Sequence, residues 1–268
     1  MRRSRLVVFV SSALLALGAA LTGAGSAQGS HLAATGGYVA LGDSYSSGVG
    51  AGSYLSSSGD CKRSTKAYPY LWNAAHGPAS FTFAACSGAR TGDVLASQLG
   101  GLNSSTGLVS ITIGGNDAGF ADVMTTCVTS SDSGCLGRID TARAYVDSTL
   151  PGKLDGVYSA IRSKAPNARV VVIGYPRFYR LGSLCLGLSE TKRSAINGAA
   201  DYLDAAVARR AAAHGFVFGD VRTPFGGHEI CSGSSWLHSL DLLNIGESYH
   251  PTASGQSGGY LPVLTSAA

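Results

Sequence analysis

Five short apolar runs recur along the chain, and several of them end directly at a glycine. Hydrophobicity within each run is nearly continuous rather than alternating, which is typical of strands covered on both faces in a parallel sheet. The predicted strands are Tyr38–Leu41, Phe81–Ala85, Leu108–Ile113, Arg169–Ile173 and Phe216–Phe218.

Helical periodicity fills the intervals between these runs. One predicted helix begins at the N-cap residue Ser189 and ends at Gly215. Strands that alternate with helices predict a three-layer α/β/α fold around a central, mostly parallel five-stranded sheet. Three Ser- and Gly-rich segments, 50–59, 130–134 and 232–235, are predicted as surface loops. Another predicted helix, earlier in the chain, ends before Pro166 and has apolar residues on one face, namely Leu154, Val157, Tyr158 and Ile161.

The amino terminus has the layout of a secretory signal peptide. Three arginines precede a mostly apolar stretch, Leu6–Leu21, and small residues follow near Ala27 and Ala34. About 16 residues is shorter than the roughly 20 that a membrane-spanning helix needs. We therefore expect a signal peptide and trimmed leader at residues 1–34, a single domain at 35–268, and a secreted, extracellular protein.

Export changes the meaning of the net charge. The chain has a formal charge of +4, but removing Arg2, Arg3 and Arg5 leaves 17 basic against 16 acidic residues. Such a balance predicts no nucleic-acid partner. A hydrophobic fraction of 45% excludes an intrinsically disordered chain.

Six cysteines in an exported chain favour disulfides over free thiols. Fifteen pairings are possible, and nearest-neighbour pairing gives Cys61–Cys86, Cys127–Cys135 and Cys185–Cys231. His228 and His238 flank Cys231 and suggest a metal site, but no C-x-x-C pair supports it. We expect two solvent-facing loop histidines, no metal and no cofactor.

Four polar blocks stand where catalytic loops would lie, three of them after predicted strands. Each block alone is ordinary turn chemistry. In an open α/β sheet, however, ligands bind where loops converge at the carboxyl ends of the strands. The blocks are Gly42-Asp43-Ser44, Cys86-Ser87-Gly88, Gly114-Gly115-Asn116-Asp117 and Glu247-Ser248-Tyr249-His250.

Together and in this order the blocks resemble the SGNH (GDSL) hydrolase family, most closely its secreted streptomycete lipases and esterases. The resemblance implies a flavodoxin-like fold with Ser44 as the nucleophile and His250 as its general base. It also implies an oxyanion hole made by the N–H of Ser44, the N–H of Gly88 and the side-chain amide of Asn116. Serine needs such a base to attack, and each oxyanion donor contributes strongly to turnover. Glycine at position 88 is expected to let the backbone approach the oxyanion without a Cβ in the way.

One position departs from the family pattern, in which Asp commonly stands three residues before the histidine. Here Glu247 occupies that place. We expect the main-chain carbonyl of Ser248 to orient the His250 ring, with Glu247 as the alternative and Asp241 as a remote one. No G-x-S-x-G elbow surrounds Ser44, which disfavours the α/β-hydrolase fold.

The remaining candidates concern substrate and support. Asp43 and Asp117 could form a glycosidase-type carboxylate pair, but bracing roles beside Ser44 and Asn116 are the better interpretation. The resemblance implies a lipase that cleaves fatty-acyl esters, with phospholipase and thioesterase side activities. The alternatives are a carbohydrate (acetyl) esterase and a non-catalytic extracellular domain that binds lipid or glycan. We expect an acyl-ester or lipid partner, a monomer, and no stable membrane anchor. Aromatic residues predicted to line an acyl groove are Tyr45, Phe120, Tyr175, Pro176, Phe178 and Tyr179.

Overall fold

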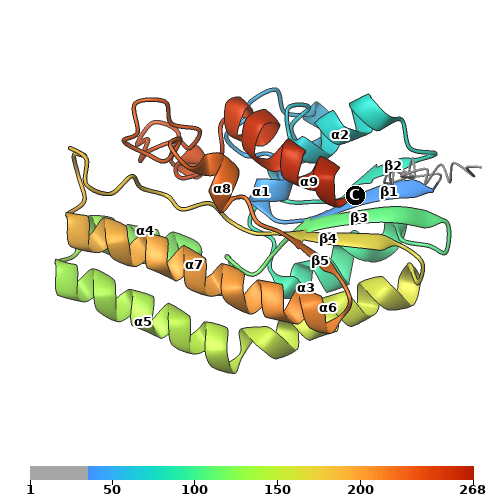
Figure 1. Cartoon of the computed structure of the whole chain (residues 1–268), viewed down its shortest axis with the longest axis horizontal. Coiled ribbons are helices and arrows are strands. Elements are labelled where there is room, and N and C mark those ends of the chain that lie inside the picture. The colour runs from blue at the N-terminus through green and yellow to red at the C-terminus, as the bar shows by residue number, and fades with distance from the viewer. Residues whose placement is uncertain (1–35) are drawn as a thin grey trace, which may run out of the picture. The chain divides into compact units, whose positions relative to one another are not determined.

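A computed structural model describes residues 36–268. Its centre is a five-stranded sheet in the order β2-β1-β3-β4-β5, in which every neighbouring pair is parallel (Figure 1). The predicted α/β class and five-stranded sheet are confirmed, and every predicted apolar run contributes a strand. The strands are β1 (Gly37–Gly42), β2 (Phe81–Phe83), β3 (Thr106–Thr112), β4 (Arg169–Ile173) and β5 (Val217–Gly219).

Helices cover both faces of this sheet, which explains the continuous apolar runs (Figure 1). The face drawn uppermost carries α1 (Ser44–Ser47), α2 (Tyr68–His76) and α9 (Leu261–Ala267), with α8 (Arg222–Phe225) beside them. The opposite face carries α3 (Thr91–Asp93), α6 (Leu150–Lys164) and α7 (Glu190–Ala213). Short 3-10 or π segments are η1 (Ser56–Cys61), η2 (Val94–Gln98), η3 (Leu99–Gly101), η4 (Ile245–Glu247) and η5 (Gly255–Tyr260).

Two further helices are α4 (Phe120–Thr129) and α5 (Asp132–Ser148); α5 packs against α7, and α4 packs against α5. The first part of α7 therefore belongs to a helix bundle rather than to the layer that covers the sheet (Figure 1). This α4–α5–α7 bundle forms the walls of the pocket described below.

The long helix α7 follows its sequence signals closely. Ser189 accepts a hydrogen bond from the N–H of Lys192 at 3.2 Å and so caps the helix. Gly215, with φ of +67°, follows the carboxyl end in the left-handed region.

One predicted loop was wrong in part. Residues 130–134 contain the start of α5, because Ser131 is its N-cap and accepts from the N–H of Gly134 at 3.2 Å. Serine and glycine here begin a helix instead of extending a loop. The predicted loop at 50–59 also contains the beginning of η1, whereas residues 232–235 contain no helix or strand.

The predicted signal peptide and leader, residues 1–34, lie outside the described residues. Across positions 36–268, no helix combines the length and apolar character needed to cross a membrane.

Candidate active site

Ser44 lies at the first turn after β1, at the carboxyl edge of the sheet. The chain turns at Gly42, whose φ is +117° and where a Cβ would come within 2.3 Å of the Thr112 carbonyl oxygen. Asp43 then caps α1, and Ser44 is the first residue of that helix. The close approach of β3 thus requires glycine before the serine.

Asp43 braces this turn from a buried position. One carboxylate oxygen accepts from the N–H of Tyr45 at 3.0 Å and from the Thr112 hydroxyl at 2.6 Å. The other accepts from the Tyr175 hydroxyl at 2.5 Å. Burial raises the pKa of Asp43 to about 6, although these hydrogen bonds oppose the shift. With all these partners, Asp43 is a structural support rather than half of a carboxylate pair.

His250 reaches Ser44 from the far end of the chain. Its Nε2 lies 2.8 Å from the Ser44 Oγ, and its Nδ1 lies 3.0 Å from the main-chain oxygen of Ser248. Because a carbonyl only accepts, Nδ1 carries the proton and Nε2 is left to accept one from Ser44. Burial lowers the pKa of His250 to about 4, which keeps the ring neutral and able to accept that proton.

The two carboxylates considered as alternatives to Ser248 are engaged elsewhere. Glu247 Oε1 accepts from the Tyr54 hydroxyl at 2.7 Å. Asp241 accepts from the N–H of Leu243 at 2.9 Å and from Asn244, closing a local turn. Of the three candidates, the Ser248 carbonyl is the group in hydrogen-bond contact with Nδ1.

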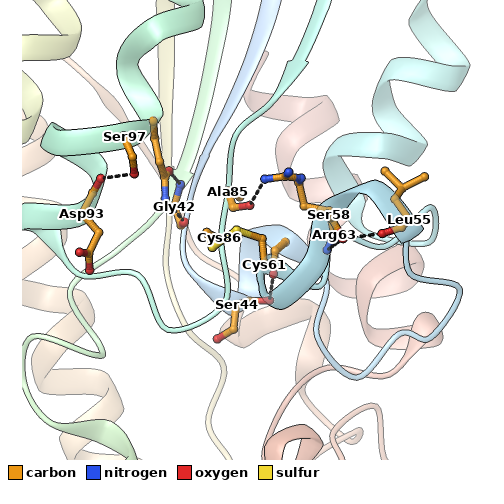
Figure 2. The surroundings of a disulfide bond; sticks show 12 residues. Gly42, Ser44, Leu55, Ser58, Cys61, Arg63, Ala85, Cys86, Asp93 and Ser97 are labelled. Atoms are coloured by element: carbon orange, nitrogen blue, oxygen red, sulfur yellow. Dashed lines mark hydrogen bonds between the residues drawn. A yellow bond between two sulfur atoms is a disulfide. The ribbon is translucent and has the colours of Figure 1, made fainter.

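Gly88 lies in the turn that follows β2. A disulfide between Cys61 and Cys86 fixes this turn, and the Ser87 N–H donates to the Cys61 carbonyl at 3.1 Å (Figure 2). Gly88 has φ of +77°, but a Cβ there would meet no protein atom within 4 Å. No protein atom therefore requires glycine at this position, but its backbone conformation favours it. That a Cβ here would obstruct the oxyanion of a substrate stays a prediction.

Asn116 follows β3 and directs its amide toward the same region. Its Nδ2 donates one hydrogen to the Ala89 carbonyl at 3.0 Å, which orients the group and leaves a second hydrogen for a ligand. Asp117 accepts from both the N–H and the hydroxyl of Thr91 at 2.9 and 2.6 Å. It therefore links the Asn116 loop to the Gly88 loop, whereas the sequence predicted support for the Asn116 turn alone.

The N–H groups of Ser44 and Gly88 are the other two predicted oxyanion donors. Neither donates a hydrogen bond to another protein group within residues 36–268. N–H groups that have no protein acceptor are available as donors to an oxyanion.

An apolar pocket leads from Ser44 and Asn116 into the α4–α5–α7 bundle. It encloses about 730 Å³, including the part open to solvent. Tyr45, Phe120, Tyr175 and Phe178 line it as predicted, whereas Pro176 and Tyr179 do not. Arg143 is the charged exception in the helical wall and packs over the Tyr202 ring. Aliphatic helix residues complete the lining, namely Val123 and Met124 from α4, Ala142 and Val146 from α5, and Ile196, Ala199, Ala200 and Leu203 from α7.

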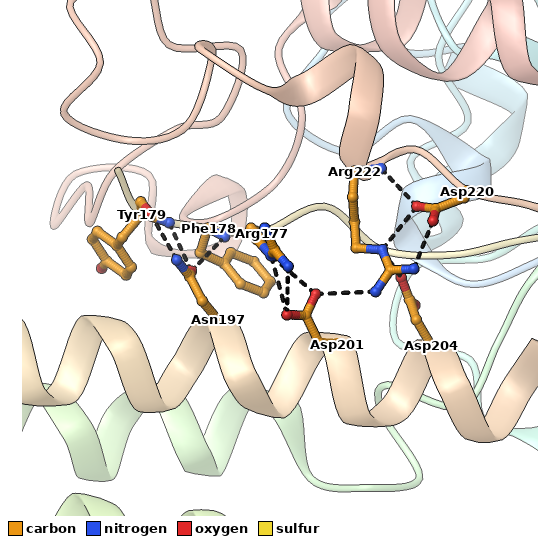
Figure 3. Close-up of polar contacts among 8 residues, drawn as sticks. All are labelled: Arg177, Phe178, Tyr179, Asn197, Asp201, Asp204, Asp220 and Arg222. Carbon is orange, nitrogen blue, oxygen red and sulfur yellow. Dashed lines mark hydrogen bonds and ion pairs between the residues drawn. The ribbon is translucent and has the colours of Figure 1, made fainter. Parts of the chain in front are cut away.

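The loop after β4 enters this pocket because α7 holds its backbone (Figure 3). Asn197 Oδ1 accepts from the N–H groups of Phe178 and Tyr179 at 2.9 and 3.0 Å, and its Nδ2 donates to the Tyr179 carbonyl. Further along α7, Asp201 bonds both Arg177 and Arg222. These contacts hold the backbone of Phe178, whose side chain lines the apolar pocket.

Disulfides link Cys61–Cys86, Cys127–Cys135 and Cys185–Cys231 in the structure, the nearest-neighbour pairs. His228 and His238 are half-buried, so the expectation of solvent-facing rings was wrong. His228 stacks on Trp236, and His238 Nε2 contacts the Gly50 carbonyl oxygen at 2.8 Å. The described part of the chain has no cluster of three groups able to hold a metal ion.

Residues 40–257 match the model of the GDSL-like lipase/acylhydrolase family. This chain belongs to that family. The GDSL hydrolase is thus a carboxylic ester hydrolase, as the four polar blocks predict.

Its relatives are close over their whole length. Lipase 1 of Streptomyces coelicolor is 76% identical, and the alignment covers all of both chains. Phospholipase A1 of Streptomyces albidoflavus is 67% identical with a TM-score of 0.86, and the extracellular lipase of Streptomyces rimosus is 67% identical with a TM-score of 0.85. Both alignments to solved structures cover 87% of this chain and all of the other.

Sequence reasoning missed the polar residues that hold the GDSL serine turn. Gln98 binds both the N–H and the carbonyl of Gly42, at 2.7 and 2.9 Å. Gln256 binds the Tyr45 carbonyl and the Tyr68 N–H at 3.0 and 2.9 Å. Tyr175 was predicted to line the groove, but its hydroxyl also accepts from the Gly115 N–H at 3.2 Å. Single glutamines in helical segments carry no sequence signal for such a role.

Proposed function

We propose that this GDSL hydrolase is an exported lipase that cleaves medium- to long-chain fatty-acyl esters, phospholipids included, through an acyl-enzyme on Ser44. The observation that carries the proposal is the apolar pocket that begins at Ser44 and continues between α4, α5 and α7. A pocket of this length and lining suits an alkyl chain, because burying each methylene contributes about 0.8 kcal/mol. An acetyl group would leave most of that surface unused.

The reaction follows from the hydrogen bonds around Ser44. His250 Nε2 takes the hydroxyl proton as the Ser44 Oγ attacks the ester carbonyl carbon. The N–H groups of Ser44 and Gly88 and the amide of Asn116 stabilise the oxyanion that forms. His250 then donates the proton to the leaving alcohol oxygen, and the acyl group stays on Ser44.

A water molecule completes the cycle. His250 takes a proton from the water, whose oxygen attacks the acyl carbon, and the ester bond to Ser44 breaks with return of the proton to Oγ. Throughout, the Ser248 carbonyl accepts a hydrogen bond from Nδ1–H of His250 and so keeps Nε2 directed at Ser44. In this scheme Ser248 supplies the orienting group that a carboxylate supplies in a Ser-His-Asp triad.

Export is part of the proposal. We expect residues 1–34 to be absent from the enzyme recovered from the medium, and the mature enzyme to be a monomer. The arginine-rich, apolar amino terminus supports the first expectation. Amino-terminal sequencing and sedimentation velocity of the secreted protein test these two points.

A fluorophosphonate probe tests the nucleophile directly. Wild type should be labelled and Ser44→Ala should not, and an unlabelled wild type would refute the hydrolase. Chain length is tested on p-nitrophenyl esters from acetyl to palmitoyl and on phosphatidylcholine. Preference for octanoyl or longer chains supports the lipase, whereas activity restricted to acetyl esters identifies a carbohydrate-type esterase instead.

A further inference from the structure

Two loops expose an unusual number of aliphatic side chains. One joins β4 to α7 and the other precedes His250; we call residues 181–188 and 239–246 the leucine loops. Leu184 and Leu186 in the first, and Leu242 and Leu243 in the second, are between 80% and 94% exposed, and Ile245 is 61% exposed. A soluble protein gains nothing from leaving such side chains in water, and clustered examples mark interaction sites.

The leucine loops lie next to each other. Leu186 and Leu188 from one loop and Leu240 from the other line a common hollow of about 290 Å³. The Cys185–Cys231 disulfide ties the first loop to the neighbouring segment, where the Arg180 N–H also donates to the Ile230 carbonyl at 2.9 Å. Figure 1 shows both segments at the same end of the molecule, beyond the carboxyl ends of the strands. The exposed leucines therefore form one surface.

This surface is continuous with the active site. Tyr249 lines the hollow between the leucine loops and directly precedes His250. Its ring packs edge-on against Phe120 and Phe178, at centroid distances of 6.5 Å each. Both phenylalanines line the acyl pocket. An apolar path thus runs from the exposed leucines to the pocket that begins at Ser44.

Charge on the leucine loops is minimal. Residues 181–188 contain no ionisable side chain other than the disulfide-bonded Cys185, and residues 239–246 contain one, Asp241. The Asp241 carboxylate is occupied by Leu243 and Asn244 of its own turn. Neither loop carries lysine or arginine, the residues that attract a protein to anionic lipids. Apolar character without positive charge fits a neutral or zwitterionic lipid surface.

We propose that the leucine loops insert into a neutral lipid–water interface and so place the mouth of the acyl pocket on its substrate. This docking site extends the proposed lipase function and rests on it. An ester chain can then leave the lipid and enter the pocket along the Tyr249, Phe178 and Phe120 rings without crossing water. Attachment is reversible, since it uses side chains of two loops rather than a spanning helix.

Vesicle binding tests the docking site separately from catalysis. Mature Ser44→Ala enzyme, which cannot consume lipid, is sedimented with phosphatidylcholine vesicles with and without L184S/L186S/L242S/L243S. Removing four inserted leucines should weaken the vesicle partition by at least ~100-fold. The matched control is L95S/L136S, which removes two exposed leucines from η2 and α5, and it should bind like the parent.

The same substitutions with Ser44 intact provide the second readout. Hydrolysis of monomeric p-nitrophenyl butyrate should stay within ~2-fold of wild type, because these leucines do not line the acyl pocket, whereas hydrolysis of vesicle phospholipid should fall with binding. Unchanged vesicle partition, or equal loss on both substrates, would overturn the proposal. Should the fourfold variant not fold, L184S/L186S and L242S/L243S are measured separately, and the proposal fails if neither weakens binding.

Two further outcomes are distinguishable. A wild type that dimerises through the leucine loops and ignores vesicles would identify a second copy of the chain as the partner and overturn the lipid surface. Loss of fluorophosphonate labelling with intact, leucine-dependent vesicle binding would instead refute the proposed hydrolysis and leave the docking surface standing.

Discussion

The main-chain oxygen of Ser248 lies 3.0 Å from Nδ1 of His250, two residues further along the chain. Between them Tyr249 has φ of +66°, a left-handed conformation that turns the Ser248 carbonyl back toward the ring. Such a conformation costs a bulky residue free energy, which the buried Tyr249 ring and the His238 main-chain hydrogen bonds offset. The histidine is thus oriented by the backbone of its own loop.

Glu247→Gln should consequently leave kcat and KM within about 3-fold of wild type. The substitution keeps an acceptor for Tyr54 and removes a charge that does not contact His250. His250→Ala should lower kcat by at least ~10³-fold, because it removes the general base. Steady-state kinetics on a soluble ester checks both. A Glu247→Gln loss as large as that of His250→Ala would mean that the carboxylate orients the ring.

Acid tolerance follows from the pKa of His250. Burial lowers it to about 4, so the ring remains a neutral base as pH falls through the range where a free histidine would protonate. The acid limb of kcat/KM should therefore have its midpoint near pH 4. Profiles measured from pH 3 to 8, with activity recovered at pH 7 to exclude unfolding, check this. A midpoint near 6.5 that does not move in Tyr175→Phe, the variant described next, contradicts the prediction.

Asp43 is the other group near Ser44 that titrates in this range. Its pKa is raised to about 6, and protonation removes an acceptor from the nucleophile turn as pH falls. Tyr175→Phe separates the two groups: losing a hydrogen bond to the carboxylate raises the pKa of Asp43 further and leaves that of His250 unchanged. A break in the profile that moves upward in this variant belongs to Asp43.

Tyr175→Phe should also lower kcat by roughly 10-fold with little change in KM. The hydroxyl bridges the Asp43 carboxylate and the Gly115 N–H, so it couples the serine turn to the Asn116 turn. Leaving those buried partners unsatisfied should reduce the free energy of unfolding by about 1–3 kcal/mol.

Tyr158→Phe is the matched control for that substitution. Tyr158 is equally buried, and its hydroxyl has no hydrogen-bond partner among residues 36–268. Its removal should leave kcat unchanged and should not lower the unfolding midpoint in urea. Equal effects of the two substitutions would show that Tyr175 acts only by filling space.

Asn116→Ala should lower kcat by about 10²–10³-fold and change KM little, because its amide binds the oxyanion more strongly than the ground-state carbonyl. Asn167→Ala, in an exposed turn after α6, is the control and should behave as wild type. A raised KM with unchanged kcat would assign Asn116 to substrate binding instead.

Removing the Cys61–Cys86 disulfide should affect catalysis as well as stability. A closure of this length stabilises by about 3 kcal/mol through the unfolded state, and this one also fixes the turn of Gly88 (Figure 2). C61A/C86A should lose more kcat than C127A/C135A, whose disulfide joins α4 to α5. Comparable losses would mean that the Gly88 turn holds without its disulfide. Peptide mapping without reduction checks the three pairs themselves.

The central strands β1, β3 and β4 were predictable because they are buried along almost their whole length and so show continuous apolar runs. The helix α5 was not, since its buried positions include small residues such as Ala142 and its amino-terminal turn is rich in serine and glycine. Its apolar face is too weak to produce a helical period. That omission hid the bundle, and with it the part of the pocket wall formed by Ala142, Arg143 and Val146.

Candidate site residues were found where local motifs name them, and missed where support comes from a distance. Ser44, Gly88, Asn116 and His250 each belong to a block that the sequence displays. Gln98 and Gln256 contact the serine turn from positions 56 and 211 residues away from their partners Gly42 and Tyr45. No local pattern records contacts of that kind, because they exist only once the sheet has formed.

Because of the α4–α5–α7 bundle, the residues that carry out the reaction and the residues that limit the acyl chain lie in different parts of the fold. The reacting groups lie at the sheet edge, while the helical wall of the pocket includes three small side chains, Ala142, Ala199 and Ala200. Enlarging one of these alanines reduces the volume of the pocket without substituting Ser44, His250 or Asn116. Selectivity for acyl length can therefore drift between relatives, or be engineered, while the rate of the chemical step stays the same.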